Sequence, residues 1–146
     1  MDFSTYIVIK NECSLTNLQN ATNTTNWGHW QSGPPTNIDA TTSGTAQLKD
    51  SAGAATGSEG TLHYDFSGFD GGTIKFAFAC PYGSSNNYFN VTNNSKYRFE
   101  IHAVSSQVKS NLGDWGESPT WPAEGNIPGG GHPLSVLIVI KDNKTT

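Results

Sequence analysis

The run TIKFAFACPYGSSNNYFNV, residues 73–91, decides the fold class of this chain. Every second residue from Ile74 to Cys80 is apolar, and the residues between them are lysine or alanine. A period of two places the apolar side chains on one face of a β-strand. Pro81 cannot donate a hydrogen bond to a neighbouring strand, and Gly83 permits a sharp turn. The stretch therefore predicts a strand, a corner and a second strand, with aromatic residues on both sides of a polar loop.

The same period recurs along the rest of the chain. Strong strands are expected at residues 4–10, 60–66, 73–80, 96–103 and 134–141, and weaker ones at 15–18, 27–30 and 45–48. Turns rich in glycine and proline separate these runs, and no helical segment of convincing length appears, a pattern typical of a β-sandwich or a barrel. We predict an all-β fold, an antiparallel β-sandwich of two sheets. Its core is expected to contain Ile7, Ile9, Phe76, Phe78, Phe99, Ile138 and Ile140.

One connection in the predicted fold is unusually long. At 146 residues the chain is expected to form a single domain, residues 1–146. Within it, residues 108–133 show no strand pattern, and such long connections in compact domains are usually functional or disordered. This segment contains Trp115 and Trp121. We expect a mobile accessory that adds both indoles to a binding surface; the alternative is that they fold back and cover a sheet face.

The charge balance excludes several classes of partner. Eight lysine and arginine residues stand against twelve acidic ones, which gives a formal net charge of −4. No basic stripe is present, so binding to nucleic acid or electrostatic attachment to anionic lipid is not expected. Any membrane contact would then rest on aromatic side chains and on recognition of a headgroup. The N-terminus shows no signal peptide, so we expect cytoplasmic synthesis with non-classical release, unless a leader has been removed.

The chain shows little that would support catalysis. It contains no Gly-X-Ser-X-Gly elbow and no phosphate-binding loop, and its four histidines lack the spacing of metal ligands. His63 and His102 are expected to face solvent on polar strand faces. Cys80 lies on the apolar face of its strand, which favours a buried, inert thiol; whether it pairs with Cys13 stays open. We predict that the protein is not an enzyme and has no cofactor and no metal.

Aromatic residues gather at loops and strand ends in four separate segments. They are Trp27, Trp30, Tyr82, Tyr88, Trp115 and Trp121. Trp and Tyr suit interfaces because one end of the side chain is apolar while the other forms hydrogen bonds, and they also stack on sugar rings. One of the first two tryptophans could instead fill the sandwich core. Four such segments together favour a binding surface.

Several motifs resemble those of a known family. NWGHW (residues 26–30), GSEGT (57–61) and CPYGSSNNYFNV (80–91) occur in order between a first strand YIVIKNE and a closing strand SVLIVIKDN. This arrangement resembles the aegerolysins, small acidic β-sandwich proteins of fungi and bacteria. Family members typically carry Ser-Trp-Gly-Lys, Glu-Gly and Cys-Pro-Trp-Gly-Ser motifs, and Trp27, Glu59 and Tyr82 fall on those three positions. Tyrosine replaces the expected tryptophan at the corner, and the long tryptophan-containing segment is a second departure.

The resemblance implies an actinoporin-like sandwich that binds a membrane sphingolipid or sterol, in some members beside a larger perforin-like protein. Aromatic rings would enter the membrane interface while hydroxyls and amides of the polar loop address a headgroup. The ligand-binding residues we expect are Trp27, Trp30, Glu59, Tyr82, Ser84, Asn86, Asn87, Tyr88, Trp115 and Trp121. The main alternative is a carbohydrate-binding lectin of the fungal fruit-body type that binds a glycan. A structural or storage role comes third.

Overall fold

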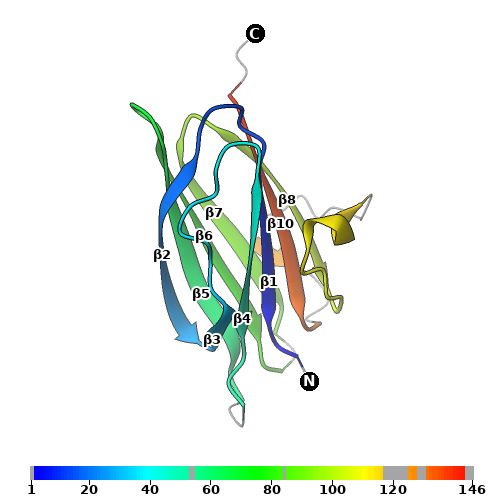
Figure 1. The fold of residues 1–146 in the computed structure, drawn as a ribbon. Coiled ribbons are helices and arrows are strands. Elements are labelled where there is room, and N and C mark those ends of the chain that lie inside the picture. The colour runs from blue at the N-terminus through cyan, green and yellow to red at the C-terminus, as the bar shows by residue number, and fades with distance from the viewer. Residues whose placement is uncertain (1, 53–54, 84, 117–124, 128–130, 144–146) are drawn as a thin grey trace.

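The computed structural model describes residues 2–52, 55–83, 85–116, 125–127 and 131–143. Within them, two five-stranded sheets pack face to face (Figure 1). Sheet A has the strand order β3-β4-β1-β10-β8, and sheet B has the order β2-β5-β6-β7-β9. The elements are β1 (Thr5–Asn11), β2 (Leu18–Trp27), β3 (His29–Ser32), β4 (Ser43–Lys49), β5 (Gly57–Phe66), β6 (Gly72–Pro81), β7 (Asn87–Ser95), β8 (Arg98–Ser105), the 3₁₀ helix η1 (Leu112–Trp115), β9 (Gly125–Ile127) and β10 (Leu134–Lys141).

This architecture confirms the predicted two-sheet β-sandwich. Paired strands run antiparallel except β1 and β10, which run parallel in the middle of sheet A. The largest departure from the expected strands is β2, a continuous strand of ten residues where only its two ends were expected. Most of its side chains are polar and exposed, because β2 is an edge strand of sheet B. It therefore lacks the apolar alternation by which the other strands were found.

The core lies between the inner faces of the two sheets. Phe89 on β7 lies against both large rings of β6, with ring centroids 5.8 Å from Phe76 and 6.1 Å from Phe78. All the expected core residues are buried except Phe99, which is half-buried and packs against the core from β8. Cys13 and Cys80 are buried free thiols and do not form a disulfide.

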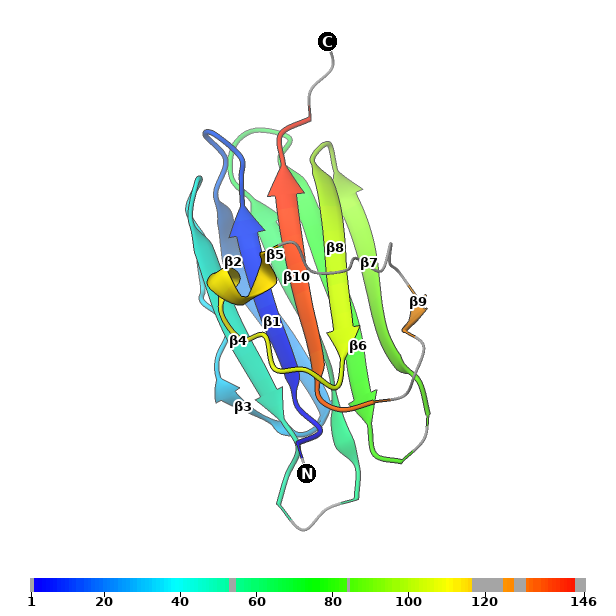
Figure 2. The same cartoon turned by 90° about the vertical axis from the view of Figure 1, so that its right-hand side faces the viewer.

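The outer face of sheet A carries a second, smaller apolar cluster that includes Trp115. The indole is 4% exposed and packs on Val8 of β1 and on Leu137 and Val139 of β10. Figure 2 shows η1 lying in front of this sheet. The ammonium of Lys109 lies 5.3 Å from the indole centroid. Both faces of β10 are apolar, so water would contact the outer one if nothing covered it.

Two expectations for the long connection are therefore wrong. Trp115 covers a sheet face, which was the alternative expectation, and is not part of an exposed binding surface. The segment 108–133 is also not free of structure, because it contains η1 and the short strand β9, which pairs with β7. Trp121 lies outside the described residues.

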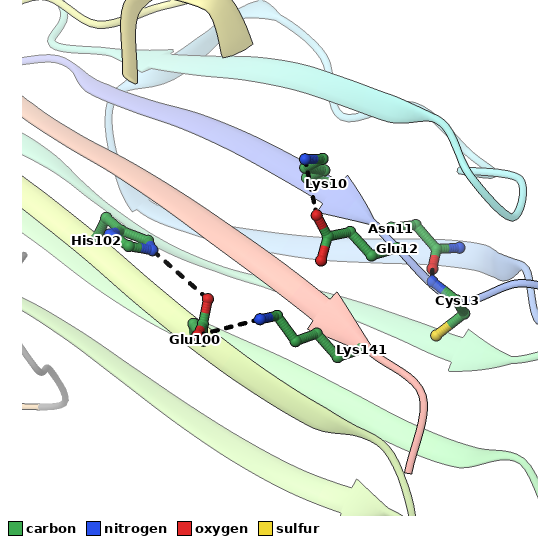
Figure 3. A network of polar contacts seen from close by, with 7 residues as sticks. All are labelled: Lys10, Asn11, Glu12, Cys13, Glu100, His102 and Lys141. Atoms are coloured by element: carbon green, nitrogen blue, oxygen red, sulfur yellow. Dashed lines mark hydrogen bonds and ion pairs between the residues drawn. The ribbon is translucent and has the colours of Figure 1, made fainter. Parts of the chain in front are cut away.

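Charged pairs cover other parts of the outer face of sheet A (Figure 3). Glu100 of β8 accepts from the Lys141 ammonium at 3.2 Å and lies 3.9 Å from the His102 imidazole. The Lys10 ammonium lies 2.7 Å from the Glu12 carboxylate. Such partly exposed pairs contribute little to stability each. His102 is half-buried, so it faces solvent less fully than expected.

Replacing Trp115 tests whether it is a structural residue. Trp115→Ala should lower the free energy of unfolding by about 3–5 kcal/mol, because a large buried ring is lost and a cavity remains. Trp115→Phe should lose clearly less, since the indole Nε1 has no hydrogen-bond partner among the described residues. Phe69→Ala, at a side chain that is 93% exposed, serves as the control and should change little. Urea denaturation followed by circular dichroism measures all three; equal curves for Trp115→Ala and the control would contradict this role.

Candidate functional site

Strand pairing in sheet B brings three predicted site residues into one row. Trp27 pairs with Glu59, Glu59 with Ala79, and Ala79 with Tyr88, across β2, β5, β6 and β7. The inward neighbours Ser58, Cys80 and Phe89 are buried, so the Glu59 and Tyr88 side chains belong to the outer face of the sheet. Trp27, Glu59 and Tyr88 are far apart in sequence, and the register of the four strands brings them into one row.

The Glu59 carboxylate is the centre of this row. One oxygen accepts a hydrogen bond from the Asn26 amide at 2.7 Å, and the other accepts one from the Tyr88 hydroxyl at 3.0 Å. Tyr88 reaches Glu59 over Ala79, which is 1% exposed. Burial, the hydrogen bond to Glu59 and the charge of that carboxylate raise the pKa of Tyr88 to about 12. Of the two expectations for Glu59, solvent-facing or paired, the structure shows a half-buried and paired side chain.

Two glycines explain the motifs that surround Trp27 and Glu59. Gly28 has a φ of +94°, and a Cβ there would lie 2.6 Å from the Lys49 carbonyl oxygen. Gly57 has a φ of +79°, and a Cβ there would lie 2.3 Å from the Cys80 carbonyl oxygen. Side chains are strained at such positive φ values, and both positions press against neighbouring backbone. The glycines thus let the chain turn directly after Trp27 and start β5 two residues before Glu59.

Tyr82 is held at the same end of the sandwich by residues that the sequence did not single out. β2 and β6 both pair antiparallel with β5, so their C-terminal ends, with Trp27 and Tyr82, lie at the end where the N-terminal segment also lies (Figure 1). The Tyr82 ring lies 5.1 Å from that of Phe3, which stacks on His132 at 4.1 Å. We call Trp27, Tyr82, Phe3 and His132 the aromatic end.

Exposure separates the members of the aromatic end. Trp27 is 48% exposed and Tyr82 is 51% exposed, whereas Phe3 is buried beneath Tyr82. The Phe3 amide also donates to the Asp50 carboxylate at 3.1 Å. Tyr82 therefore presents half of its surface to solvent while resting on an ordered support. No sequence signal pointed to Phe3, because it precedes the first expected strand.

Two other predicted site residues, Trp30 and Asn86, differ in their exposure. Trp30 is half-buried: its ring meets Phe78 edge-on at 6.1 Å, and its indole donates to the Asn23 amide oxygen at 2.9 Å. This matches the alternative in which an early tryptophan fills the core, although here it fills only the core's edge. Asn86 is exposed. Ser84 lies outside the described residues.

The expected role of Asn87 in binding a ligand is wrong. Asn87 was expected to address a headgroup, but it is 1% exposed and faces inward from β7. Its amide nitrogen donates to the Ser105 hydroxyl at 2.8 Å and to the Gly131 carbonyl at 2.6 Å. The period of two that turns Tyr88 outward turns its neighbour inward. Asn87 is thus a link between β7, β8 and the segment before β10.

The described residues offer no metal centre, since no three His, Cys, Asp or Glu side chains among them gather closely enough to hold an ion. The same part of the chain includes no helix with the length and apolar character needed to span a bilayer. The candidate site therefore consists of aromatic side chains and of the hydrogen-bonded carboxylate beside them.

Fold and site together define a two-sheet β-sandwich with exposed aromatic side chains at one end. Residues 4–115 match the family model described as Aegerolysin, and the chain belongs to the aegerolysin family. The resemblance stated from the motifs is thereby confirmed. No curated protein sequence matches the chain.

Solved structures share this fold at low sequence identity. The lipid-binding protein Nakanori has a TM-score of 0.60 at 15% identity, over 94% of this chain and 70% of that one. IP-1A from Alcaligenes faecalis has a TM-score of 0.56 at 16% identity, over 97% and 91%. RahU, solved with a Tris molecule, has a TM-score of 0.58 at 14% identity, over 97% of both chains. These likenesses show the fold alone.

The Glu59–Tyr88 hydrogen bond can be tested by titration. Glu59→Gln should lower the pKa of Tyr88 from about 12 toward its ordinary value of 10.0, because the negative charge that disfavours the tyrosinate is removed. Nuclear magnetic resonance of ring-labelled tyrosine follows this pKa directly. Tyr6, whose pKa is also raised to about 12 but by burial and Asp2, is the internal control and should not shift. An unchanged Tyr88 pKa would show that the two side chains do not interact in solution.

The same hydrogen bond predicts a pH dependence of stability. The pKa of Tyr88 is raised in the fold, so its contribution is fully present below about pH 10 and is lost as the pH rises through about 12. Over this range the wild type should lose more free energy of unfolding than Tyr88→Phe, which cannot ionise. Denaturation curves at several alkaline pH values measure the difference. Parallel losses in both proteins would contradict the prediction.

Proposed function

We propose that this protein binds membrane lipid through its aromatic end. The observation that carries the proposal is the pair of half-exposed rings, Trp27 and Tyr82, held at one end of a rigid sandwich. Large aromatic side chains of this kind favour the membrane interface, where the ring leaves water and the polar atom stays hydrated. Membership of the aegerolysin family and the shared fold of Nakanori, a lipid-binding protein, support the same function.

The charge of the protein favours recognition of a particular headgroup over general attraction to anionic lipid. With a net charge of −4, the molecule gains nothing from a negatively charged surface. Glu59 supplies a specific contact instead, because each carboxylate oxygen accepts more than the single hydrogen bond made here. A sphingolipid presents hydroxyl and amide donors, and a sterol presents a hydroxyl, at the depth that interfacial rings reach. We therefore propose that Glu59 accepts a hydrogen bond from such a lipid.

The proposal describes a binding protein, not an enzyme. This chain would recognise the membrane, and a larger, perforin-like partner would form the pore. The aromatic end leaves most of the sandwich surface free for such a partner. The chain alone, added to sphingomyelin–cholesterol vesicles, should then bind them without releasing an entrapped dye.

Loss of either exposed ring should weaken membrane binding. Trp27→Ala and Tyr82→Ala should each reduce binding to sphingomyelin–cholesterol vesicles about tenfold or more, on the scale of about 1–3 kcal/mol for a large side chain leaving water. Both side chains are half-exposed, so the variants should keep a cooperative thermal transition. Vesicle sedimentation measures binding, and phosphatidylcholine vesicles give the background.

Phe69→Ala is the matched control. Phe69 lies in the turn between β5 and β6, at the opposite end from Tyr82, and it is 93% exposed. Its loss should leave vesicle binding unchanged. Equal binding by Trp27→Ala, Tyr82→Ala and wild type would place the lipid site elsewhere. If the variants lose binding to a glycan panel and keep vesicle binding, the protein is a lectin instead.

A further inference from the structure

A polar hollow of about 300 Å³ lies on the outer face of sheet B, apart from the aromatic end. It begins at Thr61, the next outward residue of β5 after Glu59, and continues away from the aromatic end to His63. This face is the side of β2, β5 and β6 that is turned away from sheet A in Figure 1. The hollow is lined by Thr22, Asn23, Thr24, Thr61, His63 and Lys75.

Strand register builds the hollow from three neighbouring strands. Thr22, His63 and Lys75 pair in one row across β2, β5 and β6, and Thr24 and Thr61 pair in the next row. The third position of that second row is Ala77, which carries only a methyl group. The long side chains of His63 and Lys75 in the first row stand beside the short ones of the second row, which leaves space above the sheet. None of these residues belongs to the aromatic end.

The hollow is rich in hydrogen-bond donors. The Thr24 and Thr61 hydroxyl oxygens lie 2.6 Å apart, so one donates to the other and the second proton remains for a ligand. Lys75 is exposed and His63 is half-buried. Neither Lys75 nor His63 takes part in the ion pairs found among the described residues.

The described residues that line the hollow include no carboxylate, so they carry no fixed negative charge. The nearest carboxylates on the same face of β5, Glu59 and Asp65, lie outside the lining of the hollow, and Asp65 accepts from the Asn20 amide at 3.2 Å. The amide oxygen of Asn23 accepts from the Trp30 indole. An ammonium group and several N–H and O–H donors, with no carboxylate beside them in the lining, suit an anion with several oxygens.

We propose that this hollow is a second ligand site, for a polyol that carries a phosphate or sulfate group. Lys75 and His63 would bind the oxyanion, while the threonine hydroxyls would donate to it or to the ring oxygens of the polyol. The hollow has room for more than the oxyanion alone, which favours a ring beside it. The site is local, so it does not conflict with the negative net charge. Because Lys75 is exposed, the affinity should be modest and sensitive to salt.

Titration of the full chain with soluble ligands tests this site without a membrane. Glucose 6-phosphate should produce saturable chemical-shift changes at His63, Thr61 and Thr22 in nuclear magnetic resonance spectra. Glucose at the same concentrations should not, and inorganic phosphate should bind more weakly than the phosphorylated sugar. Added sodium chloride should weaken binding of both phosphate compounds. If no saturable shift occurs at these residues, or if glucose binds as well as its phosphate, the proposal is wrong.

A matched pair of variants locates the charge that binds. Lys75→Gln should weaken glucose 6-phosphate binding about fivefold, which is the scale of one exposed charge contact. Lys96→Gln removes an exposed lysine from the turn between β7 and β8, outside the hollow, and should bind like wild type. Equal weakening in both variants would show a non-specific effect of net charge and overturn the assignment.

The source of the anion is distinguished by competition in the Trp27→Ala background, where binding through the aromatic end is reduced. Phosphatidylcholine vesicles with and without a phosphatidylinositol phosphate are added to the complex with glucose 6-phosphate. Displacement only by the phosphorylated lipid identifies a lipid headgroup as the ligand, and no displacement identifies a soluble phosphorylated polyol. Failure of the hollow to bind any of these leaves the vesicle results for Trp27 and Tyr82 untouched, so the two sites are tested separately.

Discussion

The parallel pairing of β1 with β10 is the constraint on which the rest of the molecule depends. It joins the first and last strands side by side within sheet A. The pairing continues past the strands, because the Leu134 amide donates to the Ser4 carbonyl at 3.0 Å. This contact places Phe3 where Tyr82 rests on it. On the outer face, the same two strands supply the apolar patch that Trp115 covers. Core, cover and aromatic end therefore all depend on the pairing of β1 with β10.

Whether a strand could be predicted from the sequence depends on its place in the sheet. β6 was predictable because one face is buried, and burial selects an apolar residue at every second position. β2 was missed in its middle because an edge strand of polar residues is held by backbone hydrogen bonds, which leave no pattern in the side chains. The position of Trp115 could not be predicted for a different reason. The signal for its position was present in β10, whose outward residues Leu137 and Val139 need a cover, but sequence alone does not say which segment supplies it.

The candidate site was predictable in its parts and not in its assembly. Trp27, Glu59 and Tyr82 stand beside glycines, and their motifs by themselves indicate turns and exposure. The hydrogen bond from Tyr88 to Glu59 depends on the register of β5, β6 and β7, which no local pattern specifies. Phe3 could not be found either, because its importance comes from packing across the sandwich end. Asn87 was misplaced because a polar loop that ends in two asparagines does not show that β7 begins at the second of them, where the side chain turns inward.

The two thiols buried in the sandwich have a consequence for where the protein is able to work. Cys13 and Cys80 are both fully buried and unpaired, and burial raises the pKa of the first to about 11 and of the second to about 12. Neither forms the thiolate that would react with an oxidant or exchange with another disulfide near neutral pH. Because no disulfide links the two cysteines, the fold does not depend on the redox potential of its surroundings. The same native state should form in a reducing compartment and persist unchanged in an oxidising one, so a passage between the two would need neither a chaperone for disulfides nor a refolding step.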